Sequence, residues 1–219
     1  MNKKTIGIII AIIVLILIIG VGIFCAQKSK ESGSEPIKSA NEEIVQKILI
    51  AYFSRPGENP VVGNVEIGNT EILAGHIADY LGASADVFKI EPVIEYPATY
   101  EECKTIANKE KADNARPEYK NAENVNAEKY EYIFIGYPIW CENVPMIINT
   151  FLEKNNFSGK KVYLFSTNEG TGESGTYEYI KEKLSSSDVN SDGLTMLGSD
   201  VRKENASEVA VDWLRGLGF

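Results

Sequence analysis

The sequence predicts an α/β fold for residues 45–219, a three-layer α/β/α sandwich built around a five-stranded parallel sheet. Three apolar runs, at 47–53, 132–137 and 161–166, are typical of strands buried on both faces of such a sheet. Segments of helical length separate them, and right-handed crossovers would carry these helices to both faces. No internal repeat interrupts this alternation, so the segment is expected to be one domain.

The first strand leads through a loop containing glycine and asparagine to an amphipathic helix at 70–81, which Gly82 ends as a C-cap. A short strand is expected at 86–90. A connection rich in proline then precedes a polar helix at 100–114. These elements make the first half of the alternating pattern.

The second half repeats this alternation. Pro145 suits the first turn of a helix, and in the last helix Val209, Trp213 and Leu217 are expected to form the buried face. The expected elements are strands at 132–137, 161–166 and 194–198, and helices at 145–154, 177–184 and 205–217.

A single membrane-spanning helix is expected at residues 6–26, after a short flank at 1–5. This stretch has no charged residue and is about as long as a bilayer-spanning helix. A cleaved signal peptide or a lipoprotein at Cys25 is less favoured, because no cleavage site of small residues follows and a bulky phenylalanine precedes the cysteine. Residues 27–44 are polar and are expected to form a flexible tether.

The orientation of this anchor depends on few charges. Lys3, Lys4 and the α-amino group precede it, whereas Lys28 and Lys30 follow it. The small excess of positive charge before the helix favours an N-terminus in the cytoplasm. The chain is therefore expected in the cell membrane as a single-pass protein, with its folded domain on the extracytoplasmic side.

The charge of the folded part argues against nucleic acid as a partner. Residues 47–219 carry 17 Lys and Arg against 27 Asp and Glu, so their net charge is −10. An acidic surface without a basic stripe repels phosphate backbones. Nucleic-acid binding is therefore not expected.

Metal and hydrolase chemistry have little support in the sequence. Cys103 and Cys141 are the two cysteines of the folded part, and His76 is the one histidine of the chain. No metal-ligand spacing is present, and a serine hydrolase would need that histidine as its base. Burial of the cysteines as small apolar residues is favoured, and a disulfide between them stays an alternative.

An anion site is expected where the first strand ends. Ser54 follows the strand, and Gly68, Asn69 and Thr70 open the next helix, whose unpaired N–H groups and positive dipole end attract a phosphate. The alternative is an ordinary strand end followed by a helix cap at Asn69 or Thr70. The sequence has neither a Walker lysine nor a GxGxxG motif, which leaves mononucleotides and other phosphate esters as ligands.

Two further loops are expected at the same edge of the sheet. Pro138, Ile139 and Trp140 follow one strand and offer an aromatic plate. The loop 166–172 follows the next strand and is rich in small residues that can approach a flat ring. A phosphate site, an aromatic plate and a small-residue loop at one carboxyl edge fit flavin mononucleotide, FMN.

From Lys47 to Phe219 the chain resembles a flavodoxin, specifically bacterial relatives with a split phosphate loop. Their Ser/Thr-x-Thr-Gly-Asn-Thr signature is matched at its start by Ser54 and at its end by residues 68–70, and residues 55–67 replace its middle. This leaves the inner phosphate-binding threonine unassigned. The resemblance implies the strand order 2-1-3-4-5. It also implies a lid near the flavin from residues 96–118.

The resemblance further implies a set of cofactor-binding residues. Relatives often read Thr-His-Gly-Gly-Ser-Gly in the second ring-binding loop, whereas this chain has Asn168 and Glu169. An acidic side chain there would disfavour an anionic reduced flavin. The implied residues are Ser54, Arg55, Gly68, Asn69, Thr70, Pro138, Ile139, Trp140, Thr167, Asn168, Glu169, Gly170 and Gly172.

These inferences predict a membrane-anchored FMN protein that transfers electrons or acts as a flavin-dependent oxidoreductase. Its partner would be a redox protein or a quinone-like acceptor. No nicotinamide-binding segment is visible, which favours a carrier over a reductase using NAD(P)H. The alternative is a flavodoxin-fold interaction module at the cell surface that holds no cofactor.

Overall fold

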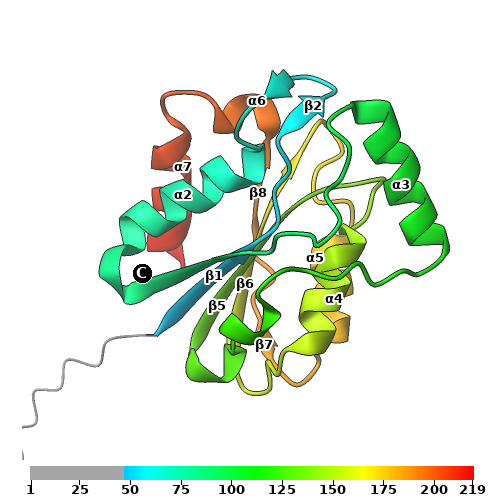
Figure 1. Ribbon diagram of the computed structural model, residues 1–219. Helices are drawn as coiled ribbons and strands as arrows, with labels where there is room; N and C mark the ends of the chain where they lie inside the picture. Colours follow the sequence, from blue (N-terminus) through cyan, green and yellow to red (C-terminus); the bar gives the residue numbers. More distant parts are fainter. Residues whose placement is uncertain (1–46) are drawn as a thin grey trace, which may run out of the picture. The chain divides into compact units, whose positions relative to one another are not determined.

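The computed structural model describes residues 47–219, and its centre is a parallel sheet of six strands (Figure 1). The strands run in the order β4-β1-β5-β6, and β7 and β8 each pair with a different part of β6. Their bounds are β1 (Ile48–Tyr52), β4 (Ala85–Lys89), β5 (Tyr132–Pro138), β6 (Lys161–Asn168), β7 (Asp188–Val189) and β8 (Leu194–Leu197).

When the strands of this sheet are numbered by their order along the chain, this is the expected order 2-1-3-4-5. The one difference is that two short strands, β7 and β8, occupy the last position, where a single strand was predicted. The break between them lies at Asn190–Gly193. There the side-chain oxygen of Asn190 accepts a hydrogen bond from the backbone N–H of Asp192 (2.6 Å). Such a local turn competes with strand pairing.

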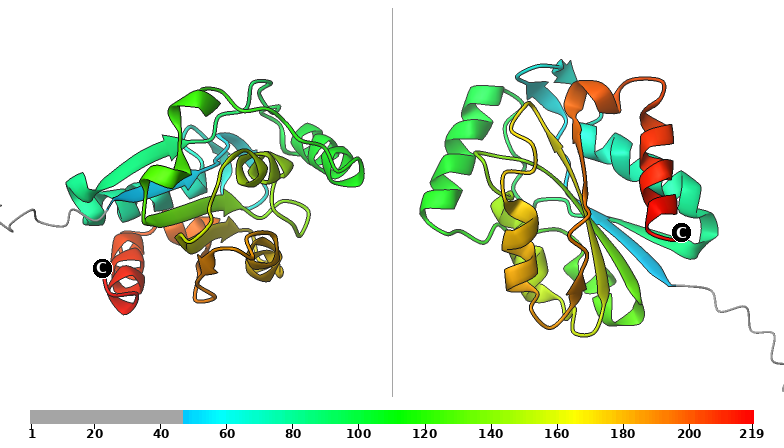
Figure 2. Two further views of the ribbon diagram at one scale, coloured as in Figure 1. Left: turned by 90° about the horizontal axis from the view of Figure 1, so that it is seen from below. Right: turned by 180° about the vertical axis from the view of Figure 1, so that it is seen from behind.

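Helices cover both faces of the sheet, as predicted (Figures 1 and 2). On one face lie α2 and α7, and on the other lie α4 and α5, with α3 packed beside α4. The bounds are α2 (Asn69–Leu81), α3 (Tyr100–Ala112), α4 (Met146–Lys154), α5 (Thr176–Lys183), α6 (Gly198–Val201) and α7 (Ala206–Gly216). Three 3₁₀ turns lie at Gly82–Ser84, Ala122–Asn124 and Ala127–Lys129.

The core consists of two apolar layers, one on each face of the sheet. All five residues of β1 are buried, as predicted for a central strand. Ile48 and Ile50 face α2 and α7, whereas Leu49 and Ala51 face α4 and α5, because successive strand residues point to opposite faces. In β5, Gly136 leaves room for the ring of Phe165 in β6, since a Cβ at Gly136 would lie 2.1 Å from that ring.

The buried face of α7 differs from the prediction. Ala206, Ala210 and Leu214 are buried, Trp213 packs at the edge of the core, and Val209 is 40% exposed. The helix is therefore rotated by about one residue from the expected stripe. Small alanines allow it to lie close beside α2, which bulky residues on that line would prevent.

Within residues 47–219 no helix is long and apolar enough to cross a membrane. The flank at 1–5, the expected membrane helix at 6–26 and the tether at 27–44 lie outside the described residues, as do the first two residues of the expected domain.

Candidate functional site

The carboxyl ends of β1, β5 and β6 border a cavity of about 350 Å³. It lies where the strand order of the parallel sheet reverses, since β4 was added on one side of β1 and β5 on the other. Ten predicted residues line it: Ser54, Arg55, Asn69, Thr70, Pro138, Ile139, Trp140, Thr167, Asn168 and Glu169. Nine further residues line the cavity and were not in the predicted set: Asn59, Pro60, Tyr100, Cys103, Lys104, Ala107, Cys141, Glu142 and Thr171. Four of them lie in the predicted lid at 96–118, and the others lie in the inserted segment 55–67, directly after Trp140, or in the loop 166–172.

The N-terminus of α2 opens onto this cavity beside the end of β1. Its N-cap is Gly68, in extended conformation and without a side-chain cap, so the expected alternative of a cap at Asn69 or Thr70 is wrong. Instead, Ser54 Oγ accepts a hydrogen bond from Glu71 N (3.1 Å), which leaves its own proton free to donate. Gly68 permits this contact, because a Cβ there would lie 2.3 Å from Ser54 Oγ.

The side chains of Asn69 and Thr70 connect α2 to the loop after β6. Thr70 Oγ1 lies 2.7 Å from Thr167 Oγ1, and both side chains are buried. Asn69 Nδ2 donates to Glu169 Oε1 (3.1 Å), while Asn69 Oδ1 accepts from Arg202 Nε (2.8 Å). Nothing in the sequence pointed to Arg202, because it reaches this site from a distant part of the chain.

The loop after β6 is shaped by Asn168. Its side-chain oxygen accepts hydrogen bonds from the N–H groups of Gly170 (2.8 Å) and Gly172 (3.2 Å), and its Nδ2 donates to Thr195 Oγ1 (3.1 Å). Both glycines border a neighbouring hollow next to β8 and not the cavity itself. Gly68 likewise lies behind the cavity wall.

Glu169 is the acidic residue of this wall. Burial raises the pKa of its carboxyl, and a hydrogen bond from the backbone of Val61 and the charge of Arg202 act in the opposite direction. A carboxylate so close to the N-terminus of α2 competes with any anion that binds there.

Trp140 is held by aromatic contacts at the other end of the cavity. Its ring centroid lies 5.1 Å from that of Phe53 and 4.9 Å from that of Tyr96, with both pairs nearly perpendicular. The side chain is half-buried and lines the cavity. The structure therefore orients the indole by edge-to-face packing and leaves part of it available to a ligand.

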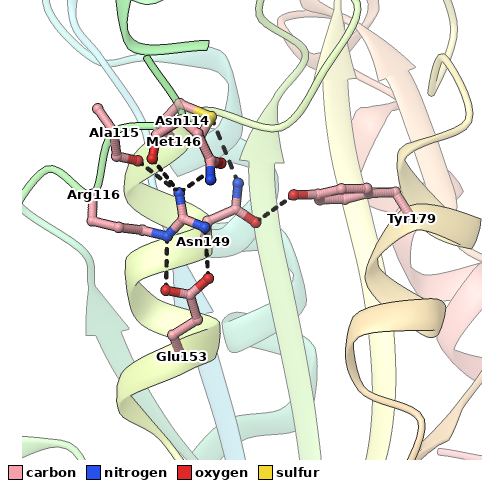
Figure 3. Close-up of polar contacts among 7 residues, drawn as sticks. All are labelled: Asn114, Ala115, Arg116, Met146, Asn149, Glu153 and Tyr179. Carbon is pink, nitrogen blue, oxygen red and sulfur yellow. Dashed lines mark hydrogen bonds and ion pairs between the residues drawn. The ribbon is translucent and has the colours of Figure 1, made fainter. Parts of the chain in front are cut away.

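The predicted lid, residues 96–118, contains α3, which forms one wall of the cavity. At its start, Arg55 Nη1 donates to the carbonyls of Pro97 (2.8 Å) and Ala98 (3.1 Å). At its end, Arg116 forms a two-pronged ion pair with Glu153 of α4, with both N–O distances 2.7 Å (Figure 3).

The same close-up shows why this attachment is firm (Figure 3). Arg116 Nη1 also donates to the carbonyl oxygens of Asn114 (2.8 Å) and Ala115 (2.9 Å). One turn before Glu153, Asn149 is fully buried, and its side-chain oxygen accepts a hydrogen bond from Tyr179 of α5 (2.8 Å). The lid is thus connected to α4, which is itself hydrogen-bonded to α5.

The residues inserted into the phosphate loop form a hairpin where a loop was expected. Its strands are β2 (Gly57–Asn59) and β3 (Gly63–Val65), which pair antiparallel at the carboxyl edge of the sheet (Figure 1). Asn59 and Pro60 reach the cavity, while Val61 is 62% exposed. The short strands are held at their base by Arg55, which also donates to the carbonyl of Glu58.

A doubly wound α/β domain with a cavity at the switch point of its sheet belongs to a class that binds nucleotide-like ligands at this edge. A flavodoxin family model matches residues 47–213. The chain therefore belongs to the flavodoxin family, as the sequence motifs implied.

Solved structures agree with this assignment. A candidate flavoprotein from Bacteroides eggerthii is 27% identical and has a TM-score of 0.61, covering 79% of this chain and 98% of that one. A flavoprotein from Lactobacillus acidophilus, solved in complex with FMN, is 21% identical with a TM-score of 0.52, covering 71% and 96% of the two chains. No curated protein matches this chain.

Proposed function

We propose that residues 47–219 bind FMN in the cavity at the carboxyl edge of the sheet and that the protein carries electrons between partners at a membrane. The observation behind this is one cavity that has a helix N-terminus at one end and Trp140 at the other. Membership of the flavodoxin family and the FMN complex of the Lactobacillus acidophilus flavoprotein support the choice of ligand.

The residues present fit such a ligand. A volume of about 350 Å³ lies within the range of small-molecule sites, roughly 300–1,000 Å³. Ser54 has a free hydroxyl proton, because its oxygen accepts from the N–H of Glu71. The N–H groups of Asn69 and Thr70, which open α2, have no partner inside the helix, so they and the Ser54 hydroxyl can donate to a phosphate. In the Thr70–Thr167 pair, one hydroxyl donates and the proton of the other is free for the ligand.

When bound, FMN supplies one- and two-electron transfer, and the protein sets its position and potential. Trp140 and Ile139 would cover the ring and exclude water from it. Glu169 would make an added negative charge less favourable in the site. The proposed anchor at 6–26 and tether at 27–44 would keep the site near membrane partners and raise its effective concentration there.

A titration of the full-length chain in detergent with FMN and, separately, with riboflavin tests this proposal. We expect stoichiometric quenching of flavin fluorescence by FMN. Thr70→Ala and Asn69→Ala should weaken FMN by about 1.5–3 kcal/mol and riboflavin much less, because they remove hydrogen bonds near a charged phosphate. Thr70→Ser should retain FMN affinity, and Thr105→Ala on the exposed side of α3 is the control.

Trp140→Ala should weaken both flavins by on the order of 1 kcal/mol, because it removes a ring contact and no phosphate contact. Trp213→Phe is the matched control, since Trp213 lies on α7 in the opposite helix layer. Absence of any flavin binding by the folded protein would overturn the proposal in favour of an interaction module without a cofactor. Equal losses for FMN and riboflavin in the Thr70 and Asn69 variants would move the phosphate elsewhere.

A further inference from the structure

Two free cysteines lie in the wall of the cavity, and the proposed flavin site assigns neither of them a role. Cys103 lies in the first half of α3 and is 4% exposed. Cys141 follows β5 and is half-buried. Both line the same cavity, so two segments that are distant in sequence bring their thiols to one wall.

Cys141 is held in a tight turn with an unusual backbone. Trp140 and Asn143 exchange backbone hydrogen bonds, with N–O distances of 2.9 and 3.0 Å. Between them Cys141 (φ 53°) and Glu142 (φ 56°) are both left-handed, which is uncommon for residues other than glycine. Such backbone persists only where the surrounding structure enforces it, and it is concentrated at functional sites.

Basic side chains surround Cys141. Lys111 Nζ donates to the carbonyl oxygen of Cys141 (2.8 Å), which connects the last turn of α3 to this turn. Burial raises the pKa of the Cys141 thiol above its usual value, and the charges of Lys111 and Lys104 offset this only in part. The thiol keeps some exposure to solvent, so its thiolate fraction can still attack a disulfide.

Cys103 has the environment of a second, resolving thiol. Burial raises its pKa to about 11, and of its charged neighbours Arg55 lowers the pKa while Glu110 raises it. The Cys141 thiol adds to this increase. A buried thiol of this kind is poor at attacking a disulfide from solvent but can attack one formed beside it.

We propose that Cys141 and Cys103 are a redox-active pair that a low-molecular-weight disulfide converts into an intramolecular disulfide, joining α3 to the turn after β5. The Cys141 thiolate attacks one sulfur of the small disulfide, and one small thiolate leaves. Cys103 then attacks Cys141 in the mixed disulfide, and the second small thiolate leaves. The two protons of the cysteines end on the two released thiols. The reaction needs no bound flavin.

The test uses the full-length chain in detergent, without added flavin, and with Cys25→Ser to remove the third thiol. The protein is equilibrated with mixtures of oxidised and reduced glutathione, quenched by alkylation and digested for mass spectrometry. We expect a peptide pair crosslinked through Cys103 and Cys141, a loss of both free thiols, and a higher melting temperature after oxidation, because the crosslink restricts the unfolded chain.

Single variants separate the two roles. With Cys103→Ser, glutathione should remain attached to Cys141, whereas with Cys141→Ser the folded protein should leave Cys103 unmodified. In the Cys103→Ser protein, Lys111→Gln should slow modification, because it removes a charge that lowers the Cys141 pKa. The smaller thiolate fraction is only partly offset by the higher intrinsic nucleophilicity of a thiol with a higher pKa. Lys109→Gln, on an exposed part of the same helix, should leave the rate unchanged.

Two results would overturn the proposal. One is a folded protein that keeps both thiols free in oxidised glutathione while the urea-unfolded chain oxidises. The other is a mixed disulfide on Cys141 that persists when Cys103 is present. Neither result depends on FMN binding, so a failure here and a failure of the proposed flavin site can be told apart.

Discussion

At the scale of single residues, Glu169 is the side chain that most sets this site apart from a simple phosphate cradle. It accepts a hydrogen bond from Asn69, which also accepts one from Arg202, so three polar side chains meet where α2 begins. The arrangement holds the helix start in place. It also puts a carboxyl where an anion is expected, and burial raises the pKa of that carboxyl.

Glu169→Gln is expected to stabilise the protein at neutral pH and not in acid. Because the pKa is higher in the folded than in the unfolded chain, ionising Glu169 opposes folding. The wild-type protein therefore loses stability as the pH rises from the ordinary carboxyl pKa to the raised one, and the loss is complete above it. Melting temperatures of the wild-type and variant proteins, measured from about pH 4 to about pH 8, test this, because the range begins near the ordinary pKa of a glutamate carboxyl. A difference that does not change with pH would contradict it.

Gly68→Ala should destabilise the fold by about 1–3 kcal/mol, as overpacking of a dense site does. The added methyl would lie 2.3 Å from Ser54 Oγ and 2.6 Å from the Arg55 carbonyl oxygen. Urea unfolding measures the change. The matched control is Gly75→Ala in the same helix, where the structure leaves open space. That variant should be more stable by about 0.5–1 kcal/mol, since alanine favours helices. Equal effects of the two variants would rule out this steric account.

At the scale of elements, the segment predicted as a lid, which contains α3 and the loop that follows it, is attached at both ends. Arg55 holds the segment before α3, and Arg116 holds the loop after it to α4. The hydrogen bond from Arg116 lowers the pKa of Glu153, and the guanidinium charge adds to this. Both side chains keep some contact with solvent, which limits what their ion pair contributes.

Urea unfolding of a double-mutant cycle of Arg116→Ala and Glu153→Ala should give a coupling energy of about 0.5–1 kcal/mol. This is near the upper end of the range for exposed ion pairs, because the guanidinium contacts both carboxylate oxygens. The Glu153 pKa is lowered by folding, so the coupling should be present above the ordinary carboxyl pKa and be lost as the pH falls through the folded value. The control cycle uses Arg215 and Asp212, an exposed pair at 3.3 Å. Coupling no larger than in this control would mean that the pair does not hold the lid.

At the scale of the whole molecule, the proposed membrane anchor would determine where the proposed flavin site works. The anchor and the tether precede the described residues, and their placement depends on the apolar stretch at 6–26 and a small charge difference around it. The acidic folded domain would be repelled by anionic lipid head groups, so the tether would hold it near the membrane without close contact.

Protease added to intact protoplasts should cut within the proposed tether at 27–44 and release a fragment of the flavodoxin-like domain, because its polar composition predicts a preferred cleavage site. Immunoblotting of the supernatant measures the release. A cytoplasmic protein of known location, probed in parallel, shows that the cells stay intact. Complete protection before lysis would place the domain in the cytoplasm.

Much of this fold could be read from local pattern. The central position of β1 followed from its continuous apolar run, and the alternation of strands and helices implied the layers. The prediction failed where packing decides between nearly equal local patterns. In α7 the buried line is Ala206, Ala210 and Leu214, because close contact with α2 selects small residues over the larger ones of the neighbouring line. The inserted segment 55–67 has no clear strand pattern and folds as a hairpin through contacts at its base.

For the site, residue pattern alone predicted which strand ends meet at the cavity, because a serine, an aromatic loop and a loop of small residues each stand directly after an apolar run. The partners of these residues could not be predicted in this way. Arg202 reaches Asn69 from near the end of the chain, the Asn168 side chain accepts hydrogen bonds from its own loop, and α3 brings Cys103 to the wall that contains Cys141. The physical reason is that strand and helix signals are local, whereas a hydrogen bond or a shared wall depends on which segments the sheet order places side by side.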